Sequence, residues 1–194
     1  GAEQVKRYYL TDRRALGGLG PLRQVIARAL AAGVDMIQIR EKDLEARTLW
    51  EFTKEIRALP NPHGTKLLIN ERVDVAQAAG LDGVHLPSRS IPAGELRRIV
   101  PIGFLIGVSA HSLEELDAEA DFAVVSPVFE SKSKPGYGPA LGVQGLAAMA
   151  KQSPIPVYAL GGITEQNAPA CVSAGAVGVA GISLFQETFG VDFL

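Results

Sequence analysis

The sequence predicts a single (β/α)₈ barrel, a TIM barrel of the α/β class, and three observations lead to that fold. Eight short, nearly continuous apolar runs follow one another along the chain, separated by stretches with helical periodicity. Three phrases, AAGVDMI, AAGLDGVH and SAGAVGVA, each combine a helix end, a glycine and the start of an apolar run. The length of 194 residues suits one domain and is too short for two of ordinary size. We therefore expect one barrel domain over residues 1–194.

The eight apolar runs are expected to be strands. Each run is short and lacks the regular alternation of a half-exposed strand, which is typical of a parallel strand covered on both faces. Parallel strands need crossover connections, and the helical stretches between the runs would supply them. The expected strands are 8–10, 36–40, 67–69, 84–86, 105–108, 122–125, 157–160 and 177–180.

The stretches between the apolar runs are expected to be amphipathic helices. In residues 22–32, for example, the large apolar side chains fall on one stripe. Residues 184–194 are hardly enough for a full closing helix, so we expect the eighth helix to be short or missing. The other expected helices are 22–32, 45–59, 73–79, 93–100, 112–120, 144–151 and 168–174.

Local signals mark several helix ends. Ser112 and Glu115 have the spacing of a capping box, in which the serine caps the third helical N–H and the glutamate reaches back. Gly33, Gly80 and Gly175 suit the left-handed residue that ends a helix. An open doubly wound sheet is the alternative fold, but it would carry a Gly-x-Gly-x-x-Gly turn after the first strand. The sequence there reads TDR, which favours the closed barrel.

Composition narrows the function classes. The formal net charge is −2 and the basic residues are scattered, which argues against nucleic acid as a partner. No apolar run reaches the length of a membrane span, and we find no signal peptide. The single cysteine, Cys171, excludes an internal disulfide framework and reads as a core residue. We expect a cytoplasmic protein that acts on small molecules; no particular oligomeric state is predicted.

Candidate site residues follow the predicted strands, because the active site of this fold lies at the carboxyl ends of the strands. Gln38 and Arg40 share one face of the second strand, and Lys42 follows them. The longest loop, 126–138, follows the sixth strand. Further candidates after the third, fourth, fifth, seventh and eighth strands are Asn70, Glu71, Arg72, Ser88, Ser90, Ser109, His111, Gly161, Gly162, Gly181, Ile182 and Ser183.

The last two of these loops are suited to an anion. Glycines at 161, 162 and 181 let backbone N–H groups approach a phosphate, which many barrels bind after strands seven and eight. Four cations converge from two other loops, which is more than one phosphate requires and favours a diphosphate or two phosphates. These cations are Arg40, Lys42, Lys132 and Lys134.

The same residues are also compatible with purely structural roles, without a bound ligand. Gly161 and Gly162 are consistent with a simple tight turn, and residues 131–134 with a surface loop. Arg40 and Lys42 have neighbours, Glu41 and Asp43, with which they would form a solvated loop. Within its apolar strand, His85 reads as a packed, hydrogen-bonded core residue, and His111 as a loop residue.

Seven phrases in register resemble the thiamine-phosphate synthase/TenI family, also described as thiamine-phosphate pyrophosphorylase-like. They extend along nearly the whole chain. They are QIREK from Gln38, INERVDVA from Ile69, DGVHL from Asp82, IGVSAH from Ile106, PVF from Pro127, SKSK from Ser131 and ALGGI from Ala159.

The resemblance implies a (β/α)₈ barrel that joins hydroxymethylpyrimidine diphosphate to a thiazole phosphate and releases diphosphate. The implied catalytic residues are Arg40, Lys42 and Lys134. By motif position, Gln38, Arg40, Lys42 and Asn70 would hold the pyrimidine diphosphate, with Ser109 beside it. Ser131, Ser133 and Lys134 stand where synthases carry Thr-x-Thr-Lys. The thiazole phosphate would bind at Gly161, Gly162, Ile182 and Ser183.

The sequence departs from the family where a Mg²⁺ cofactor is implied. Synthases place an aspartate at the position of Glu71 and a second one in the run that is here Pro87-Ser88-Arg89-Ser90. Glu71 would still serve as a metal ligand, whereas Ser90 is a poor one and Arg89 would repel the ion. We therefore expect a weakened Mg²⁺ site.

Two alternatives to the synthase follow from these departures. One is a TenI-like thiazole phosphate tautomerase, although Pro127 replaces the histidine of that branch, so that His111 or Glu130 would have to act as the base. The other is a binding protein for thiazole or thiamine phosphate without catalysis.

Overall fold

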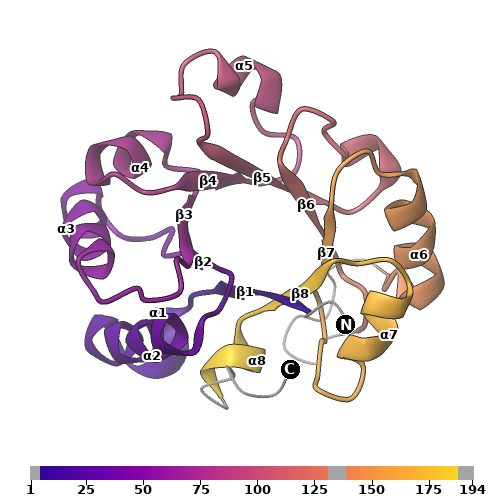
Figure 1. Cartoon of the computed structure of the whole chain (residues 1–194), viewed down its shortest axis with the longest axis horizontal. Helices are drawn as coiled ribbons and strands as arrows, with labels where there is room; N and C mark the ends of the chain where they lie inside the picture. The colour runs from indigo at the N-terminus through magenta and orange to yellow at the C-terminus, as the bar shows by residue number, and fades with distance from the viewer. Residues whose placement is uncertain (1–4, 131–138, 188–194) are drawn as a thin grey trace.

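Eight parallel strands close into a barrel in the computed structural model, which describes residues 5–130 and 139–187 (Figure 1). Every strand pairs with its neighbours in chain order, and β1 pairs with β8 to complete the ring. The predicted fold class is thus confirmed. The strands are β1 Lys6–Leu10, β2 Met36–Ile39, β3 Lys66–Asn70, β4 Gly83–Leu86, β5 Leu105–Ala110, β6 Phe122–Val125, β7 Val157–Ala159 and β8 Gly178–Gly181.

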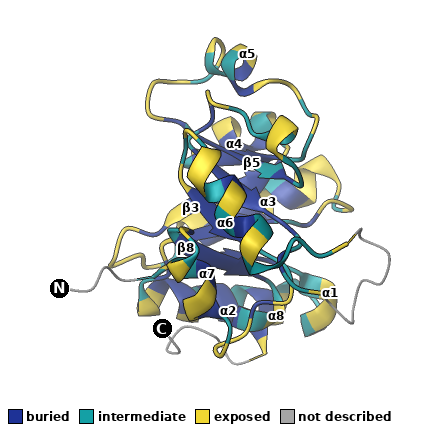
Figure 2. Ribbon diagram, turned by 90° about the vertical axis from the view of Figure 1, so that its right-hand side faces the viewer, coloured by how far each residue is buried: buried dark blue, intermediate teal, exposed yellow. Residues whose placement is uncertain are grey.

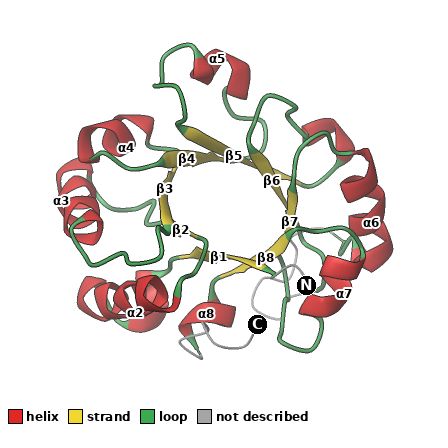
Figure 3. Cartoon of the chain, viewed as in Figure 1, coloured by secondary structure: helices red, strands yellow, loops and turns green. Residues whose placement is uncertain are grey.

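Helices surround the strands and form the outer layer (Figure 3). Their outer faces are exposed, while the strands and the inner helix faces are buried (Figure 2). The elements are α1 Arg13–Leu16, α2 Leu19–Ala32, α3 Ala46–Arg57, α4 Val73–Ala79, α5 Ala93–Arg97, η1 Leu113–Glu115, α6 Gly142–Gln152, α7 Ala168–Ser173 and α8 Ser183–Gln186.

The eighth helix is short, as predicted, with only four residues, yet it packs firmly against β1. Phe185 is buried and its ring centroid lies 5.6 Å from that of Tyr9 on β1. The Gln186 side-chain oxygen accepts hydrogen bonds from the Tyr9 hydroxyl at 2.6 Å and from the backbone N–H of Asp12 at 2.9 Å. Packing and hydrogen bonds to β1 therefore hold a helix too short to be stable alone.

The predicted helix 112–120 is wrong. Only a single 3₁₀ turn, η1, forms there, and Leu116 is already extended. The Ser112 side chain caps no N–H group, and Glu115 accepts instead from the backbone N–H of His111 at 2.8 Å. Asp117 then accepts from the backbone N–H groups of Ala93 and Glu119. These side chains stabilise a loop rather than a helix, because the contacts to His111 and Ala93 tie them to backbone groups outside the predicted helix.

Two separate apolar layers pack against the strands. Outside the barrel, Leu22, Ile26, Ile56 and other helix residues are buried against the strands, and Cys171 belongs to this layer as predicted. Each such aliphatic side chain contributes about 1.5–3 kcal/mol on burial. Inside the barrel, residues of six different strands form one cluster, namely Tyr8, Leu10, Met36, Leu68, Phe122, Val124, Tyr158 and Ala180.

A repeated aspartate fixes the amino ends of the strands. Asp35, Asp82 and Asp121 each precede a strand, and each accepts a hydrogen bond from a backbone N–H of the preceding strand at 2.7–2.8 Å. This explains two of the three repeated phrases, in which the aspartate follows the helix-ending glycine. The amino end of the barrel is therefore the part built for stability, and the carboxyl end is left for the site.

Candidate active site

The predicted site residues that the structure describes come from strand ends or the loops after them, so the parallel barrel brings them to one mouth. Gln38, Asn70 and Ser109 lie on β2, β3 and β5, with Gln38 and Asn70 buried. Gly162 and Ser183 follow β7 and β8 and are exposed. Ser131, Ser133 and Lys134 fall outside the described residues, so their predicted roles remain predictions.

A chain of hydrogen bonds crosses the barrel interior below this mouth. The Gln38 side-chain nitrogen lies 2.9 Å from the Tyr8 hydroxyl, which lies 3.0 Å from Nδ1 of His85. Nε2 of His85 lies 2.9 Å from Oγ of Ser109. Two predicted substrate-binding residues are therefore linked through two residues to which the sequence analysis assigned no catalytic role.

His85 is the packed, hydrogen-bonded residue that the sequence analysis favoured. It is 3% exposed, and its ring lies among those of Tyr8 and Phe122. Burial, and to a smaller extent the positive charge of Arg40, lowers the pKa of His85 to about 3. Burial likewise raises the pKa of Tyr8 well above its ordinary value. Both groups are therefore neutral at physiological pH.

Gly107 makes room for this interior. A Cβ at Gly107 would overlap the Phe122 ring, which packs edge-on against Tyr8 with ring centroids 5.5 Å apart. The missing side chain on β5 lets Phe122 fill the barrel centre and support Tyr8 from one side. Sequence reasoning missed Tyr8, although its position two residues before Leu10 already places both on the inner face.

The loop after β2 is organised by its acidic residues. Glu41 is 4% exposed and accepts hydrogen bonds from the Thr11 hydroxyl at 2.6 Å and from the Arg13 side chain at 3.1 Å. Asp43 pairs with Arg13 and Arg14, both at 2.6 Å. The Arg13 guanidinium holds the pKa of Asp43 well below its usual range.

These pairings argue against the alternative interpretation, in which Glu41 and Asp43 pair with the cations of their own loop. Glu41 and Asp43 pair with arginines of α1, and not with Arg40 as the solvated-loop interpretation required. Within residues 5–130 and 139–187, the Arg40 guanidinium makes no hydrogen bond or ion pair. Lys42 is exposed and borders a small hollow together with Asn70. The structure thus keeps the positive charge of Arg40 available at the mouth.

The turn after β7 has a backbone that only glycine fits well. Gly161 and Gly162 have φ angles of 108° and 63°, in the left-handed region. A Cβ at Gly161 would lie 2.8 Å from Cα of Pro127, and one at Gly162 would lie 2.9 Å from Cβ of Phe129. Among the described residues, the backbone N–H groups of Gly162 and Ser183 have no acceptor. These exposed donors suit an anion.

The same turn fixes the base of the long loop after β6. The backbone N–H groups of Val128 and Phe129 donate to the carbonyls of Leu160 and Gly161 at 2.9 and 3.0 Å. At the other end of the loop, Leu141 and Gly142 donate back to Pro127 and Val128, both at 2.8 Å. Nearby, Nδ1 of His111 lies 2.8 Å from the Ser126 carbonyl oxygen.

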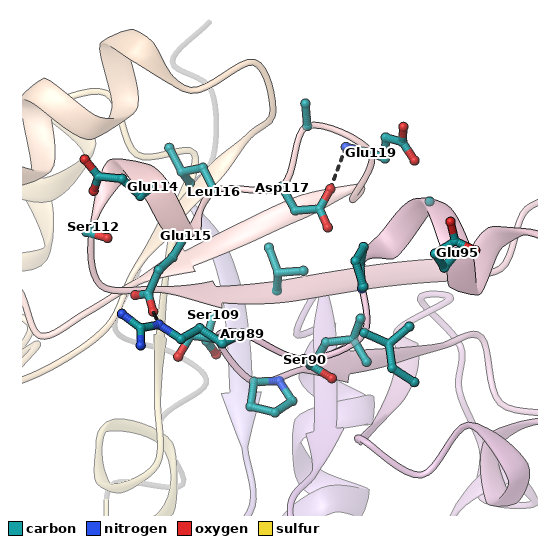
Figure 4. Close-up of a pocket in the computed structure, with 18 residues that line it drawn as sticks. Arg89, Ser90, Glu95, Ser109, Ser112, Glu114, Glu115, Leu116, Asp117 and Glu119 are labelled. Atoms are coloured by element: carbon teal, nitrogen blue, oxygen red, sulfur yellow. Dashed lines mark hydrogen bonds and ion pairs between the residues drawn. The ribbon is translucent and has the colours of Figure 1, made fainter.

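The opposite side of the mouth, around β4 and β5, holds an open cleft of about 950 Å³ (Figure 4). Arg89 extends from the loop after β4 to Glu115, with 3.4 Å between Nε and the carboxylate, and Ser109 lies beside them. Ser90 also lines the cleft. The remaining acidic residues of its wall are Glu95, Glu114, Asp117 and Glu119.

The residues present do not fit a Mg²⁺ site built by the protein alone. Glu71 supplies one exposed carboxylate, while the position at which the resemblance implies a second carboxylate holds Ser90, with Arg89 beside it. In the described part of the chain, no three histidine, cysteine or acidic side chains are grouped so as to hold a metal ion. Glu71 and Arg89 share a left-handed backbone, with φ of 64° and 61°, which is uncommon for residues other than glycine.

Comparison with known proteins identifies relatives along most of the chain. A family model described as thiamine monophosphate synthase, TMP-TENI, matches residues 7–185. A putative thiamine-phosphate synthase of Geobacter sulfurreducens is 48% identical over 180 residues, which cover 91% of this chain and 84% of the relative. Thiamine-phosphate synthase of Roseiflexus sp. is 40% identical over 180 residues, covering 91% and 76%.

Solved structures agree with these relatives. Thiamine phosphate pyrophosphorylase from Pyrococcus furiosus superposes with a TM-score of 0.81 and 32% identity, covering 97% of this chain and 91% of that protein. Among the described residues, no helix is long and apolar enough to cross a membrane.

Proposed function

Because the chain belongs to the thiamine monophosphate synthase family, we propose that it joins hydroxymethylpyrimidine diphosphate to a thiazole phosphate and releases diphosphate. One observation carries the assignment of roles. The pairing of Glu41 and Asp43 with Arg13 and Arg14 leaves the Arg40 guanidinium available at the mouth. The comparisons favour this activity over the tautomerase and the binding protein.

The main electrostatic requirement of this reaction is to stabilise the negative charge of the leaving diphosphate. The bond between the pyrimidine methylene carbon and the diphosphate oxygen breaks, and its electron pair leaves with diphosphate. The thiazole nitrogen then donates its lone pair to the methylene carbon. No proton transfer is needed to form this bond, so the protein must mainly stabilise negative charge and exclude water.

Arg40 and Lys42 are proposed to stabilise the departing diphosphate, with Lys134 as a third cation. A guanidinium binds phosphate oxygens in a bidentate manner, and an ammonium group adds a mobile point charge. Arg40 also lies close enough to His85 to lower its pKa, which puts the positive charge near the interior hydrogen-bond chain. The cation would thus act next to Ser109, at the end of that chain.

The pyrimidine ring is proposed to meet the amides of Gln38 and Asn70. The Gln38 side-chain oxygen is buried and has no hydrogen-bond partner in the described residues. A buried acceptor without a partner costs about 1–3 kcal/mol, and an amino group on the pyrimidine would satisfy it. The thiazole phosphate would bind on the other side, at the N–H groups of Gly161, Gly162, Ile182 and Ser183.

No step of the proposed reaction depends on a magnesium ion held by the protein alone. Glu71 is the one carboxylate that remains at the two family positions. Mg²⁺ requires near-octahedral oxygen coordination, so we expect it to bind weakly unless the diphosphate supplies further oxygens.

The proposal is tested by incubating the purified protein with hydroxymethylpyrimidine diphosphate and thiazole phosphate, with and without Mg²⁺. The expected result is that thiamine phosphate and diphosphate form in a one-to-one ratio. Binding of thiazole phosphate without product would favour the binding protein. Interconversion of thiazole phosphate carboxylate tautomers, without coupling to the pyrimidine, would favour the tautomerase.

A further inference from the structure

The interior hydrogen-bond chain contains two residues, Tyr8 and His85, that lie between predicted substrate-binding residues. Tyr8 is fully buried, and Gln38 and His85 are 1% and 3% exposed. The three links measure 2.9, 3.0 and 2.9 Å from Gln38 to Tyr8, to His85 and to Ser109. Each distance is that of a well-formed hydrogen bond, so the four side chains form one connected unit.

Counting donors and acceptors gives this unit a direction. A neutral imidazole has one donor nitrogen and one acceptor nitrogen, and the Tyr8 hydroxyl has one proton. When Gln38 donates to Tyr8, the Tyr8 proton goes to Nδ1 of His85, and Nε2–H of His85 donates to Ser109. The Ser109 proton is then left to point into the mouth. The opposite order would turn the Gln38 amide round and make Ser109 donate to His85.

The structure has the first order, because the Gln38 nitrogen faces Tyr8 and the Gln38 oxygen has no partner in the described residues. That order suits both ends of the pyrimidine diphosphate, the first substrate of the proposed function. The free Gln38 oxygen accepts from an amino group, and the free Ser109 proton donates to an anionic oxygen. His85 is buried, which favours the neutral ring, and no described carboxylate contacts it.

We propose that Tyr8 and His85 are positioning residues that couple Gln38 to Ser109, so that holding the pyrimidine amino group orients the Ser109 hydroxyl toward the departing diphosphate. This inference rests on the proposed function for the identity of the substrates. The hydrogen-bond order itself does not depend on the substrates, so it can be tested separately from the proposed function.

A double-mutant cycle tests the coupling. Tyr8→Phe removes one hydroxyl and keeps the ring, and Ser109→Ala removes the last member of the chain. We expect each to lower kcat with the pyrimidine diphosphate about tenfold, equivalent to about 1.4 kcal/mol. The double variant should be no worse than about the poorer single variant, because residues that act as a unit are not additive. KM for the thiazole phosphate should stay unchanged.

Tyr158→Phe is the matched control. Tyr158 lies in the same interior, with its ring centroid 5.8 Å from that of Tyr8, but its hydroxyl is not part of the chain. This variant should retain wild-type activity both alone and in the Ser109→Ala background, where the double variant should match Ser109→Ala. If the effects of Tyr8→Phe and Ser109→Ala multiply in the double variant, Tyr8 has only a structural role and the proposal is overturned.

A spectroscopic measurement separates the proposal from the proposed function. ¹⁵N NMR of the substrate-free protein should show His85 with its proton on Nε2, and Tyr8→Phe should weaken that preference. A proton on Nδ1 in the wild type would overturn the proposed order, whether or not the protein makes thiamine phosphate. A protein with the expected tautomer but without synthase activity would contradict only the proposed function.

Discussion

The two sides of the barrel mouth are built differently. On the β1–β2 side, Glu41 and Asp43 are paired with arginines of α1, and Glu41 is buried and also accepts from the Thr11 hydroxyl. On the β4–β5 side, Arg89 lies in the left-handed region and reaches across an open cleft to Glu115. The first side keeps the family's residues, and the second is where the sequence departs from them.

The difference indicates which part of the site the protein preorganises. Thr11 donates to Glu41 and accepts from the backbone N–H of Arg40 at 2.9 Å, so the loop that carries the cations is fixed before any substrate binds. Preorganised charges stabilise a transition state at little further cost. On the β4–β5 side, the Ser90 side chain makes no hydrogen bond among the described residues, so we expect variants there to have smaller effects.

The largest effect is expected from removing the cation on the organised side. Arg40→Ala should lower kcat/KM by about 100-fold or more, because it removes a positioned donor to the leaving group. Steady-state kinetics with the pyrimidine diphosphate measure this. Arg14→Ala removes a cation from the same end of the barrel but leaves Arg13 on Asp43, and it should change activity less than about threefold. Equal losses would mean that any positive charge at this mouth suffices.

Breaking the buried pair should mainly affect stability. Glu41→Gln places an amide where the carboxylate accepts from Thr11 and Arg13, and it should lower the free energy of unfolding by about 2 kcal/mol. Urea denaturation measures the change. Glu55→Gln, which alters an exposed pair with Arg23, should cost less than about 0.5 kcal/mol. The organised-side interpretation fails if the two variants are equally stable.

The metal position should respond to added charge on the other side. Ser90→Asp restores an acidic ligand, and the Mg²⁺ affinity measured by titration in the presence of diphosphate should rise about tenfold. Ser88→Asp adds the same charge to the same loop at a position that is not the family's metal ligand, and it should have a smaller effect. Arg89→Glu in addition should strengthen binding further. No gain in affinity or activity in a folded Ser90→Asp variant would count against the synthase.

The smallest effect concerns the strained backbone at Arg89. Asparagine tolerates the left-handed region better than arginine, so Arg89→Asn should raise the free energy of unfolding by about 0.5 kcal/mol. The lost pair with Glu115 is exposed on the arginine side and adds little. Arg98→Asn, at an ordinary φ of −69°, should instead lower stability slightly. Two losses of equal size would show that strain at Arg89 is not relieved.

The sequence allowed most of the fold to be predicted, because each barrel strand is buried on both faces and is therefore apolar throughout. The prediction failed at residues 112–120, where Glu115 and Asp117 bond to backbone groups instead of lying on the outer face of a helix. Helical periodicity does not reveal such contacts.

The site was predicted less fully than the fold. Motif positions named Gln38, Arg40 and Ser109, but no local pattern shows that Tyr8 bonds to His85, which is 77 residues away. The partners of Glu41 are likewise 28 to 30 residues distant in sequence. Such contacts depend on the closure of the barrel, and a residue-by-residue inspection of the sequence cannot supply them.

The pairing of Glu41 and Asp43 with Arg13 and Arg14 also has a consequence for how substrates arrive. With those carboxylates paired, Arg40 gives the β2 side positive charge, while Glu114, Asp117 and Glu119 give the far rim negative charge. We therefore expect the mouth to act as an electric dipole that draws the proposed phosphorylated substrates toward one wall during diffusion. This attraction acts on the rate of encounter and weakens with added salt, since the Debye length is only about 8 Å at physiological ionic strength.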